Sequence, residues 1–86
     1  MHEMSLLADL MKKVKEIAAA NDADEVVEVT VRLGAMAHIS PDHLREHFVK
    51  AAVGTVAEGA DLVVIESDDM ADPNAQNIIL DSIEVA

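Results

Sequence analysis

The stretch "EVVEVTVRLG" (residues 25–34) decides the fold, because its side chains alternate between apolar and polar. Two sets interleave along it: an apolar set of Val27, Val29, Val31 and Leu33, and a polar set of Glu28, Thr30 and Arg32. A period of two is the pattern of a strand that buries one face and exposes the other. We therefore predict a half-buried strand that ends at Gly34.

Helical patterns lie on both sides of this strand. Residues 5–20 repeat apolar side chains every three or four positions, which indicates an amphipathic helix with Ser5 as N-cap; the apolar set is Leu7, Leu10, Met11, Val14, Ile17 and Ala18. A second helix should begin with Ser40 as N-cap, Pro41 at its first position and Asp42 in its first turn. Its end is expected at Gly54 or Gly59, and its predicted buried stripe is Leu44, Phe48, Ala51 and Ala52.

Two further strands are predicted toward the C-terminus, at residues 61–66 and 78–86. A polar linker at 67–77, with a turn around Pro73 and Asn74, separates them. The order is α-β-α-β-β, and we expect the last two strands to form an antiparallel pair joined by a hairpin-like loop. A chain of 86 residues makes one small domain with one core.

Composition excludes several classes of function. The formal charge of −11, from 17 acidic and 6 basic residues, should repel nucleic acids and anionic membranes. No long apolar run or secretory pattern is present, so a soluble cytoplasmic protein is expected. The chain has no cysteine, so a metal would bind through nitrogen and oxygen. No arrangement of nucleophile or acid–base groups is recognisable, and we do not expect an enzyme.

The first residues, "MHEMSL", form a candidate metal chelate. The Met1 amine, the His2 amide nitrogen and the His2 imidazole can close one five-membered and one six-membered ring on a single ion. Planar nitrogen donors suit Ni(II) or Cu(II) better than Zn(II). Glu3, water or a partner's ligand would take the next position, and an incomplete site favours passing the metal on. On spacing alone, an exposed, frayed lead-in to a helix is the favoured interpretation of His2 and Glu3.

Other candidate ligands are better interpreted as ordinary surface residues. His43 and His47, four apart on the second helix, could hold a metal, but a solvated or edge-packed position is favoured. His38 is expected to be a structural loop residue. The acidic residues of the linker lack the ordered spacing of a calcium loop; they are Asp68, Asp69 and Asp72.

At this point the sequence resembles the HypA/HybF family of hydrogenase and urease nickel-incorporation proteins. The resemblance runs in order through "MHEMSL", "VVEVTVRLGAM", "SPDHLREHF", "GTVAEGADLVV" and "SIEVA". It implies a two-layer α/β (α+β) fold, with two helices packed on one face of a small three-stranded sheet. It also implies transient nickel binding by Met1, His2 and Glu3.

The resemblance further implies a metallochaperone that delivers nickel to a client such as nickel-iron hydrogenase, together with a HypB-type GTPase. An open sheet edge would allow a homodimer. Two alternatives remain: a metal-independent assembly module built on the same fold, or a paralogue that serves a different metalloenzyme or another metal such as cobalt.

The chain departs from the family between the last two strands. Family members insert there a zinc ribbon with two CxxC pairs, whereas this chain has the linker 67–77 and no cysteine. We therefore expect residues 1–86 to form a single nickel-binding domain without structural zinc. A diverged paralogue is favoured over a truncation, and whether the GTPase partnership survives is left open.

Overall fold

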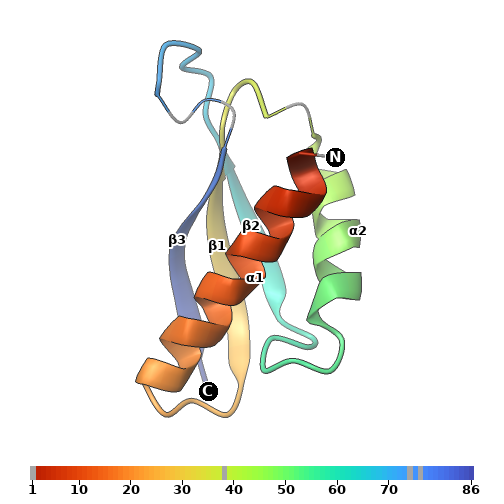
Figure 1. Cartoon of the computed structure of the whole chain (residues 1–86), viewed down its shortest axis with the longest axis vertical. Coiled ribbons are helices and arrows are strands. Elements are labelled where there is room, and N and C mark those ends of the chain that lie inside the picture. The colour runs from red at the N-terminus through yellow and green to blue at the C-terminus, as the bar shows by residue number, and fades with distance from the viewer. Residues whose placement is uncertain (1, 38, 74, 76) are drawn as a thin grey trace.

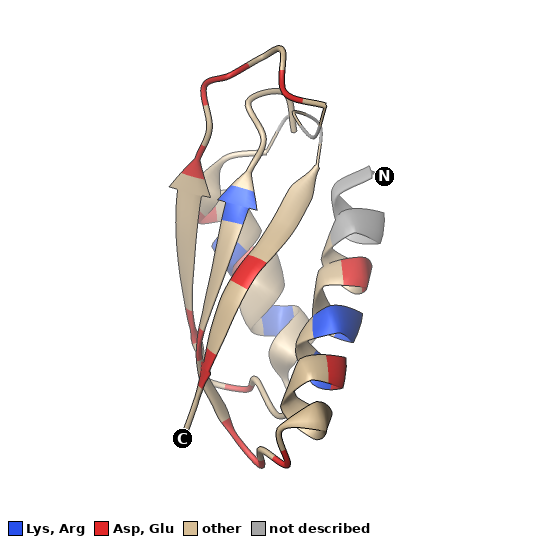
Figure 2. Cartoon of the chain, turned by 90° about the vertical axis from the view of Figure 1, so that its left-hand side faces the viewer, with Lys and Arg blue, Asp and Glu red and all other residues tan. Residues whose placement is uncertain are grey.

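Two helices and three strands follow one another in the predicted order in the computed structural model (Figure 1). The structure describes residues 2–37, 39–73, 75 and 77–86, and of residues 2–6 it describes the backbone alone. The elements are α1 (His2–Ala20), β1 (Val26–Leu33), α2 (Pro41–Ala52), β2 (Asp61–Glu66) and β3 (Ile78–Val85). The predicted two-layer α+β fold is confirmed, and both helices lie on one face of the sheet (Figure 2).

The expected pairing of the last two strands is wrong. The strand order is β2-β1-β3, so β1 lies in the centre and β2 and β3 form the two edges. β1 pairs with β2 in parallel, whereas β3 pairs antiparallel with β1. A parallel β1–β2 pair requires a crossover, which α2 provides. Because β2 occupies one side of β1, a third strand can pair only on the opposite side of β1, and β3 lies there.

The linker at 67–77 therefore passes over the end of β1 to join the two edge strands, and it is not a hairpin loop. Three backbone hydrogen bonds fasten it there: Ser67 N to Leu33 O at 2.9 Å, Met36 N to Ala75 O at 2.7 Å, and Gly34 N to Asn77 O at 3.0 Å. These bonds fix the linker against the loop after β1. Of the predicted turn, Pro73 is exposed and Asn74 lies outside the described residues.

β1 departs from strict alternation at its start. Val26 is fully buried, whereas Val27, predicted to face the core, is 36% exposed. The β1–β3 register shifts between Val26 and Glu28, which marks a bulge. An extra residue in one strand reverses the alternation beyond it, so Val26 replaces Val27 in the core while Val29 and Val31 keep their predicted places.

α1 begins earlier than predicted. Its first residue is His2, so Ser5 lies inside the helix and is not its N-cap. The predicted apolar stripe is confirmed from Leu7 to Ala18, except for Ile17, which is 39% exposed. Ile17 lies near the end of the helix, at the edge of the stripe.

α2 follows its predicted boundaries closely. The Ser40 hydroxyl oxygen accepts a hydrogen bond from His43 N at 3.2 Å, and Pro41 is the first helical residue. The helix ends at Ala52, and Gly54 follows with φ of 79°, a left-handed conformation that glycine adopts without strain. Leu44, Phe48 and Ala52 are buried as predicted, but Ala51 is exposed.

The second face of the sheet carries a mixed surface. Val63 and Ile65 on β2 are 39% and 41% exposed there. Toward the other end, the pairing places Asp61, Glu28 and Glu84 side by side across the three strands. Acidic residues are visible at that end of the sheet in Figure 2. In the described part of the chain, no helix is long and apolar enough to span a bilayer.

Candidate metal centre

The candidate chelate coincides with the start of α1. Met1 and the side chains of His2 and Glu3 lie outside the described residues, but the backbone from His2 onward is helical. The first four N–H groups of an α-helix have no acceptor within the helix. The amide nitrogen of His2 is therefore not required by the hydrogen-bond ladder of α1.

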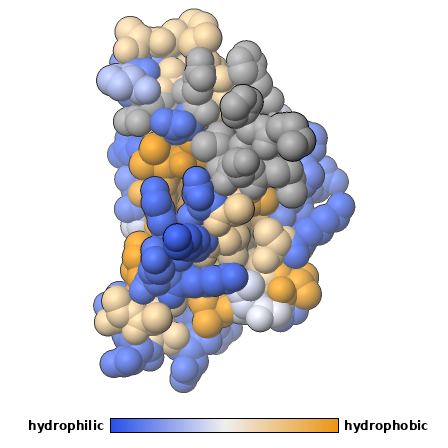
Figure 3. Space-filling model, viewed as in Figure 1, coloured by the Kyte–Doolittle hydropathy of each residue, from blue (hydrophilic) through white to orange (hydrophobic). Residues whose placement is uncertain are grey.

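The core anchors the helix that follows this terminus. Leu7, Leu10, Met11 and Val14 are at most 5% exposed, and they pack against the sheet from the second turn onward. The solvent-facing side of α1 is largely hydrophilic, with small hydrophobic patches at its edges (Figure 3). The candidate chelate thus lies at the end of a helix that is fixed to the core, and a preorganised site requires such a rigid element.

Two histidines lie on α2, and this helix begins at the same end of the molecule as α1 (Figure 1). His43 is exposed and His47 is half-buried, as predicted. Their rings stack, with centroids 4.6 Å apart and planes inclined by 22°. His38 lies outside the described residues.

The acidic linker does not form a metal site in the part of the chain that the structure describes. No group of three or more His, Asp or Glu side chains is close enough there to hold an ion. Asp69 instead stabilises a local turn, because its carboxylate accepts a hydrogen bond from Ala71 N at 3.0 Å. Asp72 also has an interaction partner, and Asp68 is exposed.

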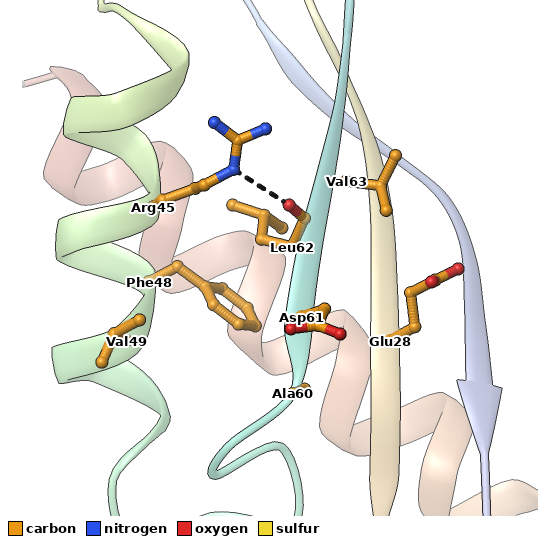
Figure 4. A pocket seen from close by; sticks show the side chains of 8 residues that line it. All are labelled: Glu28, Arg45, Phe48, Val49, Ala60, Asp61, Leu62 and Val63. Atoms are coloured by element: carbon orange, nitrogen blue, oxygen red, sulfur yellow. Dashed lines mark hydrogen bonds between the residues drawn. The ribbon is translucent and has the colours of Figure 1, made fainter.

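A hollow lies between α2 and β2 (Figure 4). It encloses about 430 Å³, and Phe48 and Leu62 form much of its apolar wall. Arg45 bridges the two elements: its Nε donates to Leu62 O at 3.1 Å and its Nη1 to Asp42 at 3.3 Å. Sequence reasoning missed this role of Arg45, because nothing in the spacing of α2 indicates a backbone acceptor on β2.

Comparison with known proteins identifies one family. Residues 1–72 match the family model described as "Hydrogenase/urease nickel incorporation, metallochaperone, hypA". The hydrogenase maturation factor HypA of Methanosarcina mazei is 41% identical over 64 residues, which are 74% of this chain and 47% of that protein. The HypA of Azorhizobium caulinodans is 38% identical over 68 residues, which are 79% of this chain and 60% of that protein. The chain thus spans about half the length of these curated relatives.

A solved structure has the same fold. The solution structure of the nickel metallochaperone HypA from Helicobacter pylori superimposes with a TM-score of 0.76, at 17% sequence identity, and the match covers 96% of each chain. This likeness includes β3, which lies beyond the residues that match the family model.

Proposed function

Because the chain belongs to the HypA family of hydrogenase/urease nickel-incorporation metallochaperones, we propose that it binds nickel at Met1, His2 and Glu3 and passes it on during metalloenzyme maturation. Nickel is the cargo in this proposal and not a resident cofactor. The protein acts as a carrier and not as a catalyst.

The position of His2 at the first residue of α1 is the observation that carries the proposal. Its N–H group has no acceptor within the helix, so the amide nitrogen can release its proton to solvent and coordinate the metal without loss of a helix hydrogen bond. With the Met1 amine and the His2 imidazole it supplies three nitrogen donors, which suit Ni(II). The fourth position is left to Glu3, water or a partner's ligand.

The helix also favours release. The positive end of the helix dipole lies at the start of α1 and weakens binding of a cation. The negative charge of the Glu3 carboxylate acts against this effect. A site with three nitrogen donors, weakened by the helix dipole, binds nickel reversibly. Reversible binding suits a delivery protein.

We also propose partners and a domain organisation for this protein. The client is a nickel metalloenzyme subunit, a HypB-type GTPase assists delivery, and the protein acts in the cytoplasm. Residues 1–86 form the single nickel-binding domain, with the linker 67–77 in place of a zinc ribbon and no structural zinc. The backbone bonds that fasten this linker over the end of β1 support its role as a self-sufficient connection.

A second candidate function is a metal-independent assembly module, a hypothesis supported by the exposed face of the sheet. Val63 and Ile65 are exposed there without cover from either helix. A protein partner could dock on this face without the involvement of His2. This alternative predicts that a pull-down of partner proteins is unaffected by chelator and by His2→Ala.

Titration of the tag-free protein with Ni(II) tests the main proposal. The wild type should bind more tightly than His2→Ala and than a form extended by Gly-Ser before Met1, since extension removes the free amine from its place in the chelate. Far-UV circular dichroism in EDTA verifies that all three forms are equally helical. Equal affinity of the three would exclude the terminal chelate.

A further inference from the structure

We propose that His43 and His47 form a second metal site on α2, selective for a divalent transition metal such as Ni(II). It is separate from the terminal chelate and does not depend on it. The spacing in sequence favours ordinary surface histidines, whereas the geometry of the two rings points to a site.

The ring separation fits a shared metal. Two imidazoles bound at right angles to one ion, with bonds of about 2.0–2.1 Å, have ring centres roughly 4.5 Å apart. The observed separation of the His43 and His47 ring centroids is 4.6 Å. The rings are stacked, so binding requires them to turn about their terminal torsions, and these torsions are broad. The backbone of α2 does not have to move.

Neither the imidazole of His43 nor that of His47 has a hydrogen-bond or ion-pair partner among the residues that the structure describes. Asp42, which could have paired with His43, is instead bonded to Arg45 at 3.3 Å. Both rings can therefore offer nitrogen donors without breaking a hydrogen bond or ion pair between described residues, and only their mutual stacking has to change.

The helix orients one of the two rings. At roughly 100° per residue, Arg45 and His47 lie on opposite flanks of the buried stripe of α2. Arg45 bonds to β2, and α2 also contacts α1. The half-buried position of His47 agrees with a place on the flank toward α1.

Electrostatics around the pair are mixed but favour a cation overall. His43 lies in the first turn of α2, where the helix dipole opposes a positive ion. Asp42 and Glu46 are adjacent in sequence and exposed, and the formal charge of −11 raises the local concentration of cations. With only two protein ligands, water completes the coordination, so the site is weak and exchanges metal quickly.

The test separates the two sites by using the Gly-Ser-extended protein, in which the terminal chelate is blocked. Ni(II) uptake is measured by equilibrium dialysis, and NMR follows the imidazole signals. The matched control exchanges two residues, His47→Val with Val49→His. It keeps the composition, puts histidine at a position that is already 61% exposed, and places the two rings about 120° apart around α2, on different faces of the helix.

The extended protein should bind one Ni(II), with selective broadening of the His43 and His47 signals. The exchanged control should bind at least about tenfold more weakly, because removing even an outer-shell partner costs 10–100-fold. Circular dichroism and thermal unfolding in EDTA confirm that both forms are folded. Equal uptake by the two, or broadening of other histidines instead, overturns the second site. Neither result depends on whether the terminal chelate exists.

Discussion

Phe48 is the largest single contribution to the core at the residue scale. It is the only aromatic residue, and it is 1% exposed. Phe48→Ala should lower the free energy of unfolding by about 3–5 kcal/mol, because the aliphatic neighbours can only partly fill the space. Urea denaturation measures this loss. Val49→Ala, one residue away but 61% exposed, is the control and should change stability by less than about 0.5 kcal/mol.

The Ser40 hydroxyl makes a smaller and more local contribution. It accepts a hydrogen bond from His43 N, one of the first amides of α2. Ser40→Ala should cost about 1 kcal/mol, whereas Ser40→Asp, which keeps an acceptor, should stay near the wild type. If the two variants melt together, the cap does not stabilise α2.

At the element scale, the bulge in β1 sets which valine enters the core. Val26→Ala should cost about 2 kcal/mol, because it leaves a cavity at a fully buried position. Val27→Ala should cost clearly less, since that side chain is 36% exposed. Paired denaturation curves decide between the bulged register and the strict alternation of the sequence, which predicts the reverse order.

The sequence predicts most elements because each has a local cause. The period of residues 25–33, the Ser-Pro-Asp start of α2 and the apolar run at 61–66 each depend on neighbours in the chain. The bulge and the position of β3 in the sheet depend on contacts between strands. Such contacts cannot be predicted from the pattern of neighbouring residues. The start of α1 was missed because Ser5, a good capping residue, lies within the first helical turns.

The candidate site was only partly predictable for the same reason. Bond counting from a free terminus indicated Met1 and His2 as ligands with Glu3 as one candidate for the next position, and the family resemblance implied all three residues. The spacing of His43 and His47 was visible in the sequence, but the ring separation and the absence of competing partners in the described residues were not. The bond from Arg45 to β2 had no signal in the sequence at all.

At the scale of the whole molecule, negative charge is the dominant feature. Glu28 lies opposite Glu84 on one neighbouring strand and opposite Asp61 on the other. Like charges in opposite positions destabilise a sheet, so Glu84→Lys should stabilise the protein by about 0.2–1 kcal/mol at low salt. The gain should shrink as salt rises and screens the charges.

Asp68→Lys is the matched control for this prediction, because it makes the same charge change in the exposed linker. If the two substitutions stabilise the protein equally, the gain comes from the lower net charge and not from the acidic residues that lie opposite one another across the sheet. Thermal unfolding at low and high NaCl distinguishes these outcomes.

The central claim is that the free N-terminus itself holds nickel. The most direct measurement is the Ni(II) dissociation constant of the protein that carries the His47→Val, Val49→His exchange, with and without the Gly-Ser extension before Met1. This background removes the second site, so that only the terminal chelate differs. We predict that the free terminus binds at least about tenfold more tightly, as expected for loss of a ligand. Equal constants for the two forms would contradict the claim.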